Sequence, residues 1–241
     1  MIKENNRRRW NTQHALIRRI LMKETNYKKA LLLLLEHHAA MHSSKLPPPP
    51  PRGGRGGRWS YQDEVLGPLT EAQYRIIPAG GQSVIWKIWH ITRIEDLTLN
   101  LLLAGAKHSL LNGKWMEKLG IDYMDVGNNM PAADVARISK SMNIKVLLAY
   151  RLAVGKRTQS ILRKLKPQTL WEKPAPERLQ RIVNEKGGRE NAAWLLKFWG
   201  GNPYANLLLM PGARHPFVHL NEISRMTPRL QRRQPNRLPT R

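Results

Sequence analysis

The chain has 241 residues, of which 41% are hydrophobic, and it contains 41 lysines and arginines, 17 aspartates and glutamates and no cysteine. This length allows one large domain or two small ones, and the absence of cysteine excludes disulfides, zinc–thiolate sites and cysteine nucleophiles, which leaves His, Asp and Glu as metal ligands. No apolar run reaches the roughly 18–20 residues that span a bilayer, and the first residues lack the apolar region of a signal peptide, so we expect a cytoplasmic protein without membrane contact.

The formal net charge of +24 favours nucleic acid or anionic surfaces as partners. Much of the excess lies at the two ends of the chain. Residues 1–24 are predicted to form a basic, partly helical N-terminal arm, and residues 233–241 a basic disordered tail. Basic ends indicate little about the function of the core.

The first helix is predicted over about 12–45, where apolar side chains and two histidines recur at the spacing of one helix face (Leu31, Leu34, Leu35, His38 and His42). The prolines from Pro47 end it. The segment 47–60, "PPPPPRGGRGGRWS", is stiff at its start, and its Gly/Arg run has no apolar side chains to bury. It is interpreted as a solvated linker, with an RGG-like RNA contact as the alternative.

The clearest element is a helix over about 83–105, which Ser83 can cap and Gly105 can end. An irregular connection over 113–131 follows, rich in Gly, Asn and Asp. Further helices are predicted over 132–141, 144–166, 175–186 and 189–199, and over 203–232 with an interruption near "MPGARHP". No alternating pattern predicts a strand, so we expect an all-α protein with four principal helices of bundle length.

His215 and His219 stand four residues apart in "ARHPFVHLNE". On a helix their side chains point the same way, which lets two imidazoles share one metal ion. Pro216 suits the first position of a helix and would make His215 the N-cap residue. The apolar stripe continues beyond the pair, so both rings are predicted to face the bundle interior.

His90 lies in the inward stripe of the helix at 83–105, between Trp86 and Ile94. An imidazole buried there without a partner would cost free energy, and metal ligation or a hydrogen bond to a second buried group would remove that cost. One histidine from this helix and two from the last would supply three neutral nitrogen ligands. Such a set leaves one position open for water, as in catalytic metal sites.

The remaining histidines leave alternatives open. His38 and His42 form a second pair with a spacing of four, and they could be the metal pair, line the same cavity, or be ordinary hydrogen-bonded residues, which their place at the end of an apolar run favours. His14, His37 and His108 have no identifiable partners and are expected on the surface.

Four segments resemble the DinB/YfiT-like superfamily: "SVIWKIWHITRIEDLTLNLLLAG", "DVGNNM", "LLAYRLAVGKRT" and "RHPFVHLNEISRM". The resemblance implies an up-down-down-up four-helix bundle over residues 25–232, with short extra helices in the connections. It also implies a divalent metal, such as Zn, Ni or Mn, on His90, His215 and His219. The implied activity is that of a thiol S-transferase, in which the metal activates a low-molecular-weight thiol, or of a hydrolase.

Three further residues are weaker candidates for the site. Glu222, three residues after His219, could hydrogen-bond a ligand imidazole, and Asp96 could do the same or pair with Arg93. Tyr150 could donate into the cavity or be a core tyrosine with a satisfied hydroxyl.

The sequence therefore supports two competing hypotheses of function, from different classes. The first is a metal-dependent enzyme for a small-molecule substrate, with a homodimer as a further expectation. The alternative is a nucleic-acid-binding protein that uses its basic ends and the RGG-like segment. A bundle that keeps the fold without the chemistry is a third hypothesis.

Overall fold

The computed structural model describes residues 2–47 and 59–232, and all regular secondary structure within these ranges is helical. The α-helices are α1 (Ile2–Ile20), α2 (Tyr27–Ala40), α3 (Tyr61–Leu66), α4 (Glu71–Arg75), α5 (Val84–Glu95), α6 (Ser109–Asn112), α7 (Trp115–Leu119), α8 (Ala132–Ser141), α9 (Ile144–Arg163), α10 (Pro176–Asn184), α11 (Ala193–Gly201), α12 (Tyr204–Leu209) and α13 (His215–Arg232). Two π-helical segments, Asp96–Leu103 and Met210–Arg214, and 3-10 turns at Glu24–Asn26, Pro167–Trp171 and Glu190–Ala192 complete them.

The predicted helix over 83–105 is confirmed at both ends. The Ser83 hydroxyl accepts a hydrogen bond from the Trp86 backbone N–H at 3.1 Å, as an N-cap residue does. The helix widens into the π-helical segment and stops at Gly105, whose φ of +65° favours glycine. Every residue of α5 is buried, so this helix forms the centre of the molecule.

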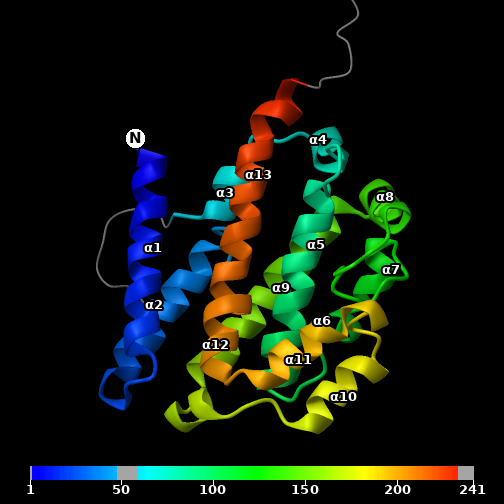
Figure 1. The fold of residues 1–241 in the computed structure, drawn as a ribbon. Helices are drawn as coiled ribbons and strands as arrows, with labels where there is room; N and C mark the ends of the chain where they lie inside the picture. The colour runs from blue at the N-terminus through cyan, green and yellow to red at the C-terminus, as the bar shows by residue number, and fades with distance from the viewer. Residues whose placement is uncertain (1, 48–58, 233–241) are drawn as a thin grey trace, which may run out of the picture.

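The single helix predicted over 12–45 is wrong, because the chain forms two helices there. The polar segment Lys23–Asn26 interrupts the apolar face, and α2 folds back along α1 (Figure 1). Trp10 and Ile17 of α1 are buried in the contact, and the Trp10 indole N–H donates to the His37 carbonyl at 3.3 Å. The basic N-terminal segment is thus packed on the core through its apolar face.

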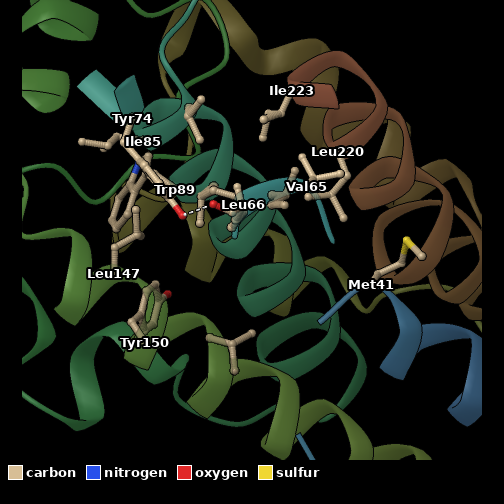
Figure 2. Close-up of a cluster of buried hydrophobic side chains, with 14 of the residues drawn as sticks. Met41, Val65, Leu66, Tyr74, Ile85, Trp89, Leu147, Tyr150, Leu220 and Ile223 are labelled. Carbon is tan, nitrogen blue, oxygen red and sulfur yellow. Dashed lines mark hydrogen bonds between the residues drawn. The ribbon is translucent and has the colours of Figure 1, made fainter. Parts of the chain in front are cut away.

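The main core lies between α3, α5, α9 and α13. Figure 2 shows side chains from all four helices meeting there, among them Val65, Trp89, Leu147 and Leu220. This packing holds α13 against α5, and the predicted metal ligands lie on these two helices. None of the helices in the described ranges combines the length and apolar character needed to cross a bilayer.

The last helical element is continuous through the interruption that the sequence predicts near "MPGARHP". The π-helical segment Met210–Arg214 carries the chain from α12 into α13 with no break, although it contains Pro211 and Gly212. His215 has helical dihedral angles, φ −60° and ψ −49°, so the prediction that it is an N-cap residue is wrong. Pro216 occupies the first turn of α13, where its missing N–H is tolerated because a wider turn precedes it.

Two smaller differences concern connections. The segment 113–131 contains the short helix α7 in addition to irregular backbone. Residues 48–58, which make up most of the predicted linker, and the predicted tail 233–241 lie outside the described residues.

The packing of α13 against the core predicts a position-dependent loss of stability. Leu220 is 0% exposed and Val218 is 37% exposed, and they flank His219. Leu220→Ala should lower the free energy of unfolding by about 2–5 kcal/mol, because it leaves a cavity in the core. Urea denaturation measures this loss. Val218→Ala is the matched control and should change stability little; equal losses in the two variants would contradict the packing described.

Candidate metal centre

Helices α5 and α13 bring the three predicted histidines together. His90 comes from the middle of α5, and His215 and His219 come from the first two turns of α13. The His215 Nε2 atom lies 3.1 Å from His90 Nε2 and 3.1 Å from His219 Nε2. Each ring offers one ligand atom, and the three atoms all lie within 4.8 Å of one another.

Hydrogen bonds behind the rings determine their tautomers. The His90 Nδ1–H donates to the Val126 carbonyl at 2.6 Å, and the His219 Nδ1–H donates to Glu222 Oε2 at 2.9 Å. Both Nε2 atoms therefore turn a lone pair toward His215, which has a single ring proton when neutral and can satisfy one of them at most. A cation bound among the three nitrogens would remove this conflict.

The spacing of the rings fits a small transition-metal ion. Nitrogens at about 2.0–2.1 Å from a tetrahedral zinc ion stand about 3.3 Å apart, close to the separations in this cluster. Burial lowers the pKa of His90 to about 3 and holds the pKa of His215 well below its usual value. The two imidazoles are thus neutral and ready to bind a metal at neutral pH.

Glu222 and Lys87 support the triad from outside. The Glu222 carboxylate accepts hydrogen bonds from His219 and from the Lys87 ammonium, the latter at 2.6 Å. These contacts, first the one from His219, lower the pKa of Glu222 to about 2 against the opposing effect of burial. The contact predicted for Glu222 is present. Lys87 and the Val126 carbonyl were not predicted, although Lys87 stands three residues before His90 on the same helix.

A family model described as the DinB superfamily matches residues 57–210, which is more than half of the chain. The chain belongs to the DinB superfamily. No curated protein matches it. The matched residues of this DinB protein include His90 and end before His215, so the geometry of the structure, and not the match, brings the last two histidines to the site.

Asp96 and Tyr150 lie in a separate buried network of this DinB protein. Asp96 Oδ2 accepts from Arg93 Nη1 at 3.1 Å, from the Tyr150 hydroxyl at 2.6 Å and from the Leu110 backbone N–H at 3.0 Å. Asp96 Oδ1 accepts from the Ser109 backbone N–H at 2.7 Å. Of the alternatives left open, the structure thus shows Asp96 paired with Arg93 and Tyr150 as a core residue with a satisfied hydroxyl.

A second group of potential ligands lies at the far end of α2. His38 Nε2 is 2.8 Å from Glu95 Oε1, and His42 Nε2 is 3.0 Å from Glu95 Oε2. Burial lowers the pKa of His42 to about 3. Burial also favours the neutral form of Glu95. The two adjacent imidazoles outweigh this effect of burial and keep the pKa of Glu95 well below its usual value. Glu95 was not predicted, although an acid on a wholly buried helix, five residues after His90, was a signal for it.

The prediction that His14, His37 and His108 lie on the surface is wrong. His37 and His108 are fully buried and His14 is half-buried. His37 stacks on Trp10 with ring centroids 3.7 Å apart, and His108 Nε2 lies 3.0 Å from Glu185 Oε2. Helix α1 covers the His37 side of α2, a contact that the local sequence around His37 does not reveal.

Removing the carboxylate behind His219 should weaken metal binding without removing a ligand. Partners that orient a ligand imidazole contribute about 10–100-fold to metal affinity. Glu222→Ala should therefore raise the dissociation constant for Zn²⁺ by that factor, as measured by competition with a chromophoric chelator. Glu71→Ala removes a carboxylate of a surface ion pair and should leave the constant unchanged. Equal constants in both variants would contradict the role of Glu222.

The buried imidazoles predict that the metal-free protein loses stability in mild acid. Burial lowers the pKa of His37 to about 2 and that of His42 and His90 to about 3, against about 6.5 when unfolded. Below pH 6.5 the unfolded chain therefore binds more protons than the folded one. In the presence of EDTA, the free energy of unfolding should fall from pH 7 to pH 5, by up to about 1.4 kcal/mol per pH unit for each histidine. Urea titrations that show constant stability over this range would contradict neutral buried histidines.

Proposed function

We propose that this DinB protein is a metal-dependent enzyme that acts on a small molecule, as a thiol S-transferase or a hydrolase. The metal, Zn, Ni or Mn, would be held by His90, His215 and His219. The observation that carries the proposal is the convergence of three Nε2 atoms, two of them with fixed lone pairs, at a site with partial exposure. His219 is 15% exposed and His90 is 4% exposed.

Three nitrogen ligands leave a coordination position open, which supports catalysis more than a closed structural site. A metal bound there lowers the pKa of a coordinated thiol or water, so that the nucleophile forms near neutral pH. Since the chain has no cysteine, the sulfur in the transferase version comes from a low-molecular-weight thiol cosubstrate. Glu222 and Lys87 keep His219 oriented, and Trp86 stacks on His90 with ring centroids 4.7 Å apart.

The proposal extends to the arrangement of the bundle. Four of the longer helices, α2, α5, α9 and α13, would correspond to the up-down-down-up bundle that the sequence resemblance implies. A cytoplasmic location and a homodimer belong to the same proposal.

The variant His90→Ala tests the proposed activity. Purified wild-type protein, loaded with Zn²⁺, Ni²⁺ or Mn²⁺, should catalyse either transfer of a thiol to an electrophile such as monobromobimane or hydrolysis of an activated ester. His90→Ala should lower that rate at least 100-fold and lose the triad's ion, with unchanged far-ultraviolet circular dichroism. A wild-type rate that equals that of His90→Ala in both assays would refute the enzyme.

One observation supports polyanion binding as a second candidate. A groove between α1 and the α11–α12 region is lined by Arg18, Arg19 and Arg214, with no carboxylate among its lining residues. Phosphates would meet fixed positive charge there. Affinity for single-stranded RNA should then fall steeply with salt, and Arg18→Glu with Arg19→Glu should flatten that dependence. Binding that does not change with salt would eliminate this candidate.

A further inference from the structure

The cluster of His38, His42 and Glu95 is separate from the triad and is built from different elements. His38 lies in the last turn of α2 and His42 two residues beyond its end. The backbone N–H of Met41 donates to the His38 carbonyl at 3.0 Å, and that of His42 donates to the Ala39 carbonyl at 3.2 Å. These bonds continue the helical turn, so both rings stay on the same side of α2 and meet Glu95 at the end of α5.

The donor set is one that transition metals accept. Two imidazoles and one carboxylate bind Zn²⁺ in metalloproteases and Fe²⁺ in non-haem oxygenases. The ligand atoms of the cluster lie within 4.8 Å of one another, which is the compactness that the triad shows. Their side chains are 0–1% exposed, so the ligand atoms are shielded from bulk solvent.

Comparison with the next residue indicates that Glu95 has a different role from an ordinary buried carboxylate. Asp96 accepts hydrogen bonds from Arg93, from two backbone N–H groups and from the Tyr150 hydroxyl. These donors satisfy both oxygens of its carboxylate. The hydrogen bonds to Glu95 come instead from the rings of His38 and His42 and, at 2.8 Å, from the Thr158 hydroxyl.

The nearest guanidinium forms an ion pair with Glu95 but donates no hydrogen bond to it. Arg151 Nη1 stands 3.9 Å from Glu95 Oε2, beyond hydrogen-bonding distance. The guanidinium donates instead to Gln62 Oε1 at 2.7 Å, to the Met41 carbonyl at 2.8 Å and to Thr92 Oγ1 at 3.4 Å. Its hydrogen bonds thus go to other oxygens, and the carboxylate accepts from the two imidazoles and from the Thr158 hydroxyl.

Helix α9 is shaped to admit one of these imidazoles. Gly155 lies inside α9, where glycine costs about 1 kcal/mol relative to alanine. A Cβ at this position would stand 2.7 Å from both Nδ1 and Cε1 of His42, too close for the ring to stay. The glycine therefore leaves room for the His42 ring in the orientation that turns Nε2 toward Glu95.

We propose that His38, His42 and Glu95 form a second, closed metal site that binds a divalent transition-metal ion and fastens α2 to α5. The two Nε2 atoms and both oxygens of the Glu95 carboxylate supply four donor atoms, which closes the site, and the proton on each Nε2 moves to Nδ1. Neither Nδ1 atom has a hydrogen-bond partner among the described residues, so both are free to take the proton. With no exposed face, this site stabilises the fold and is not a catalytic centre.

The decisive experiment removes the triad and asks whether metal binding remains. His90→Ala combined with His219→Ala is refolded from urea with excess Co²⁺, so that a buried site can load, and bound cobalt is measured after dialysis. We expect one Co²⁺ per chain and a melting temperature that rises with Co²⁺ concentration. Adding Glu95→Gln should abolish both effects. No bound Co²⁺ in the folded double variant would overturn the proposal.

A glycine substitution tests the same site with every ligand in place. In the double-variant background, Gly155→Ala should weaken Co²⁺ binding at least tenfold, because the new methyl group displaces the His42 ring. Gly188→Ala is the matched control, since a Cβ there meets no atom within 4 Å. Equal Co²⁺ affinities in these two variants would contradict the site. Failure of the triad alone gives a different result: the wild-type protein and the double variant would then bind equal amounts of cobalt.

Discussion

The fold depends on one constraint, which is that a wholly buried helix carries polar and charged side chains. Every residue of α5 is buried, and among them are Lys87, His90, Arg93 and Glu95, with Asp96 following directly. Each of these groups would destabilise the protein if it were left without a partner. The surrounding helices are therefore placed where they can supply partners as well as apolar contacts. Helix α13 provides Glu222 to Lys87, and α9 provides Tyr150 to Asp96.

The same constraint brings two candidate metal clusters close together in sequence. His90 and Glu95 are five residues apart, which places them about 140° apart around a helix. One side of α5 therefore places His90 beside His215 and His219 of α13. Another side places Glu95 beside the two histidines at the end of α2. The triad is partly open and its rings are oriented by a carboxylate and a carbonyl. The second cluster is closed and lies against Gly155 of α9.

The chemical difference between the clusters follows from the hydrogen-bond partners of the Nδ1 atoms, which point away from the cluster centre. In the triad, Val126 and Glu222 bind the outer nitrogens, so the Nε2 lone pairs are turned toward a common centre. In the second cluster the Nδ1 atoms have no such partners among the described residues, and the Nε2 atoms hydrogen-bond to Glu95. The triad is therefore arranged to bind a metal ion that keeps one coordination position for a ligand from solvent. The second cluster requires a shift of tautomer and is suited to an ion that stays in place.

The sequence by itself determined the helical class, the ends of the central helix, and the choice of His90, His215 and His219. These follow from local rules: capping by Ser83, the spacing of apolar side chains, and the one-turn separation of two histidines on a helix. The tertiary structure decided what the remaining polar groups do. It placed Glu95 between His38 and His42, buried His37 under α1, and carried the last helix through Pro211. Such outcomes depend on which surfaces come together across long separations in the chain, and spacing along one helix holds no information about them.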